Sequence, residues 1–588
     1  MKPEIMNAYL YLRLKDFTLG LLFCLFAAVC SNVNAVPAIS TKDFLTYAVR
    51  PISDVMILPD TFPVPGEETD TLFLSAAKGE YEPASFVIRP TKNITGLKLT
   101  PTPLKSDAGV IPAENIDIKI VKTWYQGGSA WVNINPDPKR VLVPELLLND
   151  DTLVRVKPDS RDNYLKLNFS NGPRYVLISS AKLNEKPVYH AVEEFPVKDA
   201  KTLLPVDIEK DTNKQFWITV KVPRVASAGK YSGQIFFGQD GARLGKLNIQ
   251  VEVLPFELEA PKQIYSIYYR GKLQPDTPTI SSESKSNEQI KAELKDMLAH
   301  GISNPTMYQY FVHSQTAEGL IKDVLKLRRE AGFTADTLYF LGMNTGICNT
   351  NTEQATLKQR VSQLLELARP FGIKEVYIYG IDEAEGEKLL AQRKAWEAVH
   401  QAGAKVYVAG HTGNFHRVGD LLDLLVAAYE PNKDEAAKYH SIGHQVFSYA
   451  NPQVGVENPL VYRRNYGFML WKNDYDGAMD YAYQDSFGSI WNDFDGKYRD
   501  HVFAYPTVDG VIDTIAWEGF REGVDDVRYV TTLQRRIDGA KRSSTPQQRL
   551  AAEQAQEFLN RLKEEPNESL DLTGVRQKIA RFITLLPQ

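Results

Sequence analysis

The stretch EVYIYGIDEA, residues 375–384, joins an apolar run to a pair of adjacent acids. β-Branched and aromatic residues over Glu375–Tyr379 predict a short buried strand. Residues 385–402 have the spacing of an amphipathic helix. The pair Asp382-Glu383 therefore lies where a strand gives way to a helix, and a strand followed by a helix is the building unit of a parallel sheet.

The same order of strand and helix recurs on both sides of this unit. Five such units follow one another between residues 264 and 424, and further candidate strands bring the number to eight. Because more than four parallel strands in succession favour a closed barrel, we expect a (β/α)8 TIM-like barrel over residues 260–516. The expected strands are Ile264–Tyr269, Thr306–Tyr310, Leu338–Leu341, Glu375–Tyr379, Lys405–Ala409, Leu425–Tyr429, Gln445–Tyr449 and Gly477–Tyr483. The expected helices cover 287–300, 317–331, 356–368, 385–402 and 418–424.

The residues before and after the barrel have other patterns. Short alternating runs such as Ser85–Arg89 and Gln215–Val222 are separated by Pro, Gly, Asn and Asp, and we assign residues 36–259 to a β-sandwich domain. Residues 517–588 are helical in pattern and charged, so they are expected to pack on the barrel as a C-terminal helical element. The charged run Arg521–Asp526 within them is interpreted as a structural ion-pair network.

The N-terminus has the pattern of a secretory signal peptide. Basic residues precede the apolar run Phe17–Val29, which is too short to span a bilayer. The flanking small residues predict cleavage after Ala35, so residues 1–35 are assigned to the signal peptide and the protein to the periplasm or the exterior. Lipidation at Cys30 is the alternative, but a residue as bulky as Val29 does not suit the position before a lipidated cysteine.

Composition narrows the class of protein. Of 588 residues, 43% are hydrophobic and 24% charged, which excludes a disordered, collagen-like or polytopic membrane protein. The chain has 68 Lys and Arg residues and 73 Asp and Glu residues. The resulting net charge of −5 gives no indication of binding to nucleic acid or to an anionic membrane. We expect a small, neutral or polar partner. After signal cleavage Cys348 is the one cysteine left, which excludes an intramolecular disulfide and a Cys-based metal site.

No cofactor or metal motif accompanies the acidic pair. The chain lacks the Gly-rich dinucleotide and P-loop sequences and the Gly-x-Ser-x-Gly nucleophile elbow. His440 and His444 have the spacing of one helical face, but neither an HExxH sequence nor a third ligand accompanies them. We therefore expect neither a cofactor nor a metal ion.

The position of the acidic pair in the predicted barrel indicates a catalytic role. Asp382 and Glu383 follow the fourth expected strand, and the carboxyl-terminal face of a barrel is where catalytic groups are placed. Two adjacent carboxylates repel when both are ionised, so one pKa should rise, as a general acid requires, while the other group stays anionic. The alternative is structural: Asp382 would cap a helix that begins near Glu385, and Glu383 would be a first-turn acid.

Several ordered motifs resemble glycoside hydrolase family 123 and its relatives. They are YGIDEAEG (379–386), GFMLWKNDYDGAMDYAYQ (467–484), YPTVDG (505–510) and WEGFREGVDDVRYV (517–530). Upstream, AAKGEYEPASFVIRP (76–90), VKTWYQ (121–126) and LVPELLLNDDTLV (142–154) resemble the sandwich domain that accompanies such barrels. The similarity extends over nearly the whole mature chain.

The resemblance implies retaining, substrate-assisted hydrolysis of terminal β-linked N-acetylgalactosamine. Glu383 matches the general acid/base, and Asp382 matches the carboxylate that orients and polarises the 2-acetamido group. Because the acetamido oxygen attacks its own anomeric carbon, the protein needs no carboxylate nucleophile. In agreement, the seventh expected strand, Gln445–Tyr449, offers no carboxylate.

Further residues are candidates for binding the amino sugar. A sugar pocket needs flat apolar faces and hydroxyl-binding groups, so we looked for aromatic and polar residues at strand ends. The predicted substrate-binding residues are Tyr268, His411, Asn414, Tyr449, Trp471, Asp474 and Tyr475; Tyr429, Tyr481, Tyr483 and Trp491 also qualify by position. The alternatives are core packing for the aromatics, turn stabilisation for Asp474 and an ordinary loop hydrogen bond for His411.

The sequence thus predicts an exported β-N-acetylgalactosaminidase-like glycosidase that acts on a carbohydrate and needs no cofactor. A related exo-glycosidase with another sugar specificity is the alternative among enzymes. A glycan-binding protein that has lost activity is the alternative of another class, but such a protein has no physical reason to keep two mutually repelling acids.

Overall fold

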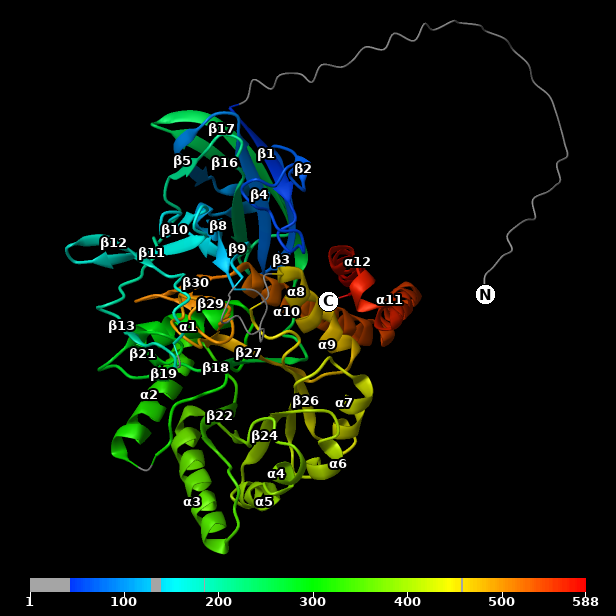
Figure 1. Cartoon of the computed structure of the whole chain (residues 1–588). Coiled ribbons are helices and arrows are strands. Elements are labelled where there is room, and N and C mark those ends of the chain that lie inside the picture. Colours follow the sequence, from blue (N-terminus) through cyan, green and yellow to red (C-terminus); the bar gives the residue numbers. More distant parts are fainter. Residues whose placement is uncertain (1–42, 128–138, 185, 313, 456–457, 588) are drawn as a thin grey trace, which may run out of the picture. The chain divides into compact units, whose positions relative to one another are not determined.

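A computed structural model describes residues 43–127, 139–184, 186–312, 314–455 and 458–587 (Figure 1). The signal peptide predicted for residues 1–35 lies outside these residues. The domain boundaries expected at residues 259 and 516 stay predictions. Among the described helices, none is both long enough and apolar enough to cross a membrane.

Two sheets form the N-terminal region, and their strands pair antiparallel except for β17 with β3, which pair parallel. One has the strand order β2-β1-β4-β15-β8-β9, and the other has the order β14-β5-β16-β17-β3 with β6 and β7 at its side. Phe216 of β15 lies opposite Phe86 of β4, and the Phe86 ring packs 6.2 Å from that of Phe237 in the other sheet. The two sheets therefore share one apolar core, as a sandwich does. The bounds are β1 (Phe44–Val49), β2 (Glu67–Glu68), β3 (Thr71–Lys78), β4 (Tyr81–Pro90), β5 (Ile94–Pro101), β6 (Leu104–Ser106), β7 (Gly109–Ile111), β8 (Ile116–Gln126), β9 (Val141–Leu148), β14 (Val206–Ile208), β15 (Lys214–Lys221), β16 (Gly229–Gln239) and β17 (Ala242–Glu257).

Parallel strands from residue 264 onward form the barrel sheet. Its order is β18-β27-β26-β25-β24-β23-β22, with bounds β18 (Ile264–Tyr269), β22 (Thr337–Asn344), β23 (Glu375–Tyr379), β24 (Lys405–Gly410), β25 (Leu424–Ala427), β26 (Gln445–Ser448) and β27 (Gly477–Asp485). The segment 303–307 fills the gap between β18 and β22. Thr306 N donates to Ile267 O at 3.0 Å, and Met307 N donates to Tyr339 O at 2.9 Å. The ring is closed at eight positions, which confirms the expected fold class.

The second barrel position is shorter than predicted. The strand expected over Thr306–Tyr310 is reduced to a single bridge between Met307 and Phe340. Pro305 has no backbone donor, which limits pairing just before this bridge. Small strands elsewhere are β10 (Val154–Lys157), β11 (Asp162–Phe169), β12 (Gly172–Leu177), β13 (His190–Ala191), β19 (Lys272–Leu273), β20 (Thr279–Ile280), β21 (Ser284–Lys285), β28 (His501–Val502), β29 (Ala504–Pro506) and β30 (Val511–Asp513).

Helices alternate with the barrel strands. They are α1 (Asn287–Ala299), α2 (Gln315–Ala331), α3 (Asn351–Ala368), α4 (Gly386–Leu390), α5 (Arg393–Gln401), α6 (Phe415–Val418), α7 (Lys433–His440), α8 (Pro459–Tyr466) and α9 (Phe468–Lys472). The helix expected over 385–402 is divided into α4 and α5. The helix expected over 418–424 is wrong, because α6 ends at Val418 and β25 begins at Leu424. A short apolar run suits either a buried helix or a buried strand, so its pattern could not decide.

Three helices end the chain: α10 (Ile515–Lys541), α11 (Pro546–Glu564) and α12 (Leu572–Leu585), drawn in brown to red in Figure 1. They share an apolar cluster with one another. Charges are buried beside it: Asp526 of α10 accepts hydrogen bonds from Arg463 of α8 and Arg576 of α12, and Glu522 accepts from Arg576. The ion-pair network expected at 521–526 is confirmed.

Candidate active site

A tight turn presents the two acids at the carboxyl end of β23. Glu383 has φ +44, a left-handed conformation that few non-glycine residues adopt. Its backbone N–H donates to Ala409 O of the neighbouring strand β24 at 3.1 Å, which holds the turn against the barrel. Residues on such strained turns are frequent at functional sites.

A chain of tyrosine hydroxyls holds Asp382. Tyr379 OH donates to Asp382 Oδ1 at 2.5 Å, and its oxygen lies 3.1 Å from Tyr268 OH and 3.3 Å from Ala409 N. Because Tyr379 has a single hydroxyl hydrogen, Tyr268 must donate to Tyr379. Burial raises the pKa of both phenols, so they remain neutral donors. The orientation of Asp382 is therefore fixed by two side chains from the barrel interior.

Glu383 is less enclosed, with a side chain that is 39% exposed. Burial raises its pKa above the usual 4.5, and the charge of Asp382 raises it further. His411 and a hydrogen bond from Tyr449 act in the opposite direction. A carboxyl group with a raised pKa beside an anchored carboxylate can supply a proton to a bound substrate.

The capping alternative for the acidic pair is wrong. The residue before α4 is Glu385, whose side chain makes no capping hydrogen bond, and the acid in the first turn is Glu387. Asp382 bonds Tyr379 instead of a helix backbone.

Four of the predicted sugar-binding residues lie around the pair. The Tyr268 and Tyr449 rings are 5.7 Å apart, and Tyr449 OH accepts from Gln453 Nε2 at 2.8 Å. His411 Nε2 lies 3.9 Å from Glu383 Oε2. Asn414 is buried beneath the end of β24, and its Nδ2 has no hydrogen-bond partner among the described residues.

The other three do not join them. Trp471, Asp474 and Tyr475 precede β27 and so lie toward its amino end, where Asp476 O accepts from the first residue of β18. Lys563 of α11 pairs with Asp474 at 2.7 Å and lies over the Trp471 ring, and buried Tyr475 OH accepts from Asn432 N. The loop packs against helices, away from the carboxyl face that carries the acids. The prediction that Trp471, Asp474 and Tyr475 contact the sugar is therefore wrong. Of the additional aromatics, Trp491 is packed with Trp124 and Tyr505, Tyr483 donates to Asp296, and Tyr429 stands near Tyr475.

Three residues near the acidic pair and its neighbours were not predicted: Tyr308, Arg270 and Asp485. Asp382 is among the charges that raise the pKa of Tyr308, a change caused mainly by burial. Arg270, just after β18, lies 5.5 Å from the Tyr308 ring and accompanies Tyr481 and Asp485 of β27. The usable signal was position, because Arg270 and Asp485 stand at strand ends on the same face as the acidic pair.

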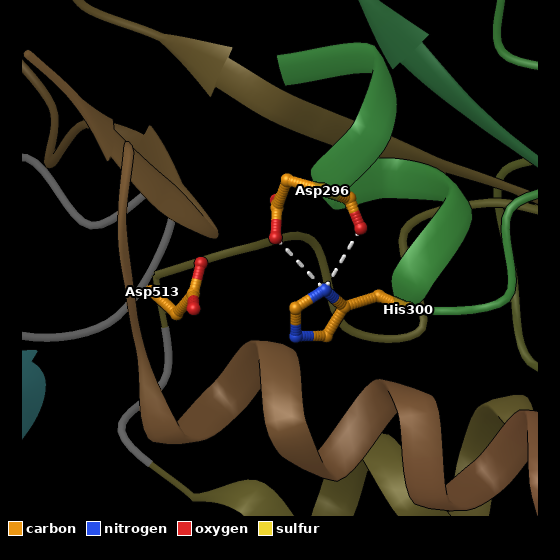
Figure 2. A group of neighbouring side chains, drawn as sticks. All are labelled: Asp296, His300 and Asp513. Atoms are coloured by element: carbon orange, nitrogen blue, oxygen red, sulfur yellow. Dashed lines mark hydrogen bonds and ion pairs between the residues drawn. The ribbon is translucent and has the colours of Figure 1, made fainter. Parts of the chain in front are cut away.

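One group of side chains has the arrangement of metal ligands: Asp296, His300 and Asp513 (Figure 2). His300 Nδ1 lies 3.0 Å from Asp296 Oδ1, and Asp513 pairs with Lys119 at 3.1 Å. Burial lowers the pKa of His300, but Asp296 and Glu518 outweigh it and raise that pKa to about 10. The described contacts of this group are those of an ion-pair network, in which His300 pairs with Asp296 and Asp513 with Lys119.

Comparison with known proteins gives the family. Residues 342–533 match the model of the glycoside hydrolase 123 catalytic domain, and they include both acids. The chain carries a glycoside hydrolase 123 catalytic domain. This match supports glycan hydrolysis as the chemistry of these residues.

A solved structure has the same fold as this chain. A family 123 glycoside hydrolase from Clostridium perfringens matches with a TM-score of 0.60 at 12% identity, over 92% of this chain and 100% of that one. A family 39 glycoside hydrolase from Bacteroides cellulosilyticus WH2 gives 0.32 at 9% identity, over 55% of this chain and 75% of that one, a score too low to indicate a shared fold. No curated protein sequence matches the chain.

Proposed function

We propose that this glycoside hydrolase removes terminal β-linked N-acetylgalactosamine from glycans, with retention of configuration and with the substrate's own 2-acetamido group as the nucleophile. The observation that carries the proposal is the pairing of an anchored Asp382, held through Tyr379, with Glu383, whose pKa is raised. The family resemblance supplies the sugar and the two roles.

In the first step Glu383 gives its proton to the glycosidic oxygen as the bond from that oxygen to the anomeric carbon breaks. The acetamido oxygen forms a new bond to the anomeric carbon, and the leaving group departs as an alcohol. The cyclic product is an oxazolinium ion. In the second step water attacks the anomeric carbon, Glu383 takes its proton, and the ring reopens. Two inversions at one carbon give retention.

Asp382 supports the cyclic intermediate. Its carboxylate accepts the N–H of the acetamido group and stabilises the positive charge that develops there. The hydrogen bond from Tyr379 leaves Oδ2 available for that contact, since the tyrosine bonds Oδ1. Preorganised charge of this kind needs no rearrangement at the moment of reaction.

A two-carboxylate mechanism would need an enzyme nucleophile on another strand. Asp485 ends β27 on the same face of the barrel, but its Oδ2 accepts from Tyr481 at 2.5 Å and its Oδ1 faces Arg270 at 3.1 Å. Because both carboxylate oxygens of Asp485 have partners, this residue is better suited to a structural role than to attack on a sugar.

The proposal is tested by a panel of aryl β-glycosides of N-acetylgalactosamine, N-acetylglucosamine and galactose. We expect the first to be hydrolysed best and the galactoside to be almost inert. Preference for N-acetylglucosamine would mean a related exo-glycosidase, and binding without hydrolysis of any member would mean a glycan-binding protein.

Export is proposed from the signal-peptide pattern of residues 1–35. N-terminal sequencing of the mature protein from its native host should begin at Val36. Recovery of an uncleaved chain from the cytoplasm would contradict export.

A further inference from the structure

Two exposed tyrosines lie toward the end of the barrel that carries the acidic pair. Tyr310 is 59% exposed and Tyr189 is 46% exposed. Tyr310 precedes Phe311, whose N–H donates to Gly342 O near the carboxyl end of β22. Tyr189 belongs to the segment between β12 and β14, directly before β13.

One largely buried salt bridge, between Lys272 and Glu283, lies beside both tyrosines. Lys272 Nζ donates to Tyr310 OH at 2.7 Å and to Glu283 Oε2 at 2.7 Å. Burial raises the pKa of the Tyr189 hydroxyl to about 12, and the charge of the nearby Glu283 adds to this. Lys272 Nζ also lies 4.1 Å from the centre of the Tyr310 ring. The Tyr310 hydroxyl is therefore held by Lys272, while a large part of each ring remains open to solvent.

The segment that carries Tyr189 is tied down on both sides of it. Val188 N donates to Gly488 O at 2.9 Å, and His190 Nε2 lies 3.0 Å from Ser489 Oγ. β13 (His190–Ala191) then pairs with β20 (Thr279–Ile280). A ring held this way loses little conformational freedom when a ligand binds, which favours affinity.

Neighbouring side chains lead from this salt bridge toward the acidic pair. Glu283 forms a salt bridge with Arg270, and Arg270 lies over the Tyr308 ring. The charge of Asp382 in turn helps to raise the pKa of Tyr308. Along this route Arg270 and Lys272 are balanced by Glu283 and Asp485. Within this described group, the charges of the two cations and the two carboxylates cancel beside the aromatic faces.

We propose that Tyr189 and Tyr310 form a second sugar subsite that stacks a neutral pyranose of the glycan whose amino sugar is cleaved. The C–H face of a pyranose packs on an aromatic ring, and the balanced charges favour a neutral sugar over an acidic one. The N-terminal region then contributes to substrate recognition through Tyr189. The inference rests on the proposed function for the identity of the sugar at Asp382 and Glu383.

Kinetics on substrates of two lengths test the subsite. Tyr310→Ala and Tyr189→Ala should each raise KM for a neutral trisaccharide with terminal N-acetylgalactosamine by about threefold to tenfold more than KM for the aryl monosaccharide. Tyr310→Phe, which keeps the ring, should restore most of the difference. Phe73→Ala removes an exposed aromatic side chain of β3 and should change neither value. Equal changes on both substrates, or none on the trisaccharide, would overturn the subsite.

Binding measurements separate this inference from the proposed function. Calorimetry with Glu383→Gln and the uncleaved neutral trisaccharide should show the same loss with Tyr189→Ala and Tyr310→Ala, whichever terminal sugar the enzyme proves to cleave. Tighter binding of a sialylated oligosaccharide would overturn the neutral-sugar assignment.

Discussion

Two adjacent acidic pairs in this chain, Asp382-Glu383 and Asp525-Asp526, have opposite surroundings. Asp526 is fully buried and is bonded by Arg463 and Arg576, while Asp525 pairs with Arg528. Asp382 is held by a neutral tyrosine hydroxyl, and Glu383 is partly open to solvent. Buried acids that are matched by arginines fix helices in place. At the open strand end, a neutral donor holds the Asp382 carboxylate in place, and the partly exposed Glu383 can exchange a proton with a substrate.

The largest effect is expected at Glu383. Glu383→Gln should lower kcat/KM on natural glycosides by about 10³-fold or more, because the leaving oxygen loses its proton donor. Activated aryl glycosides need less protonation and should be partly spared. Steady-state kinetics on both substrate types check this, and an equal loss on both would argue against the acid role.

Replacing one Asp by Asn in each acidic pair should have different effects in the two pairs. Asp382→Asn should lower kcat by roughly 10²- to 10³-fold with an unchanged free energy of unfolding, because an amide cannot stabilise the oxazolinium charge. Asp526→Asn should instead cost about 3–5 kcal/mol of stability and leave kcat of the folded enzyme unchanged, since two buried arginines lose their partner. Urea unfolding and kinetics of both variants provide the comparison, which fails if Asp382→Asn acts through stability.

Tyr379 is expected to act as a positioning residue for Asp382. Tyr379→Phe removes a hydrogen bond to a charged group, worth about 1.5–3 kcal/mol, so kcat should fall roughly tenfold to hundredfold. KM and the melting temperature should change little. Tyr377→Phe on the same strand is the matched control and should keep normal kcat. A rise in KM alone would show that Tyr379 contacts the sugar directly.

The smallest effect is expected at Glu80, whose carboxyl group lies near the charge of Asp525. Burial raises its pKa to about 8, and the charge of Asp525 adds to this. Because the folded state holds this proton more tightly, the contribution to stability is complete below about pH 4.5 and is lost as the pH rises toward 8. Glu80→Gln should therefore gain melting temperature relative to wild type between pH 5 and 8. The exposed control Glu252→Gln should show no such trend, and parallel curves for wild type and Glu80→Gln would refute the shift.

Much of the barrel could be predicted because its strands are buried apolar runs with distinct ends. Seven of the expected strands correspond to β18 and β22–β27, whereas the segment at Thr306 is only a bridge. The helix expected at 418–424 failed because a short apolar run has no diagnostic period.

Site residues could be predicted only where they lie next to a recognisable strand in the sequence. Asp382 and Glu383 could be placed because they come directly after a strand. The loop at Trp471 was wrongly predicted to lie near the acids. It precedes β27, and residues before a barrel strand lie on the opposite face of the barrel from residues that follow one. The bonds from Tyr268 through Tyr379 to Asp382 could not be predicted, because they depend on which strands of a closed ring face one another.

In the proposed mechanism the nucleophile comes from the substrate. A thiazoline analogue of N-acetylgalactosamine, which mimics the bicyclic intermediate, is therefore the most direct probe. We predict that it inhibits with a Ki at least about 10²-fold below that of N-acetylgalactosamine itself, and that mass spectrometry of the enzyme during turnover finds no sugar bound to any Asp or Glu. Weak inhibition together with a trapped sugar ester, on Asp485 or another carboxylate, would contradict the claim.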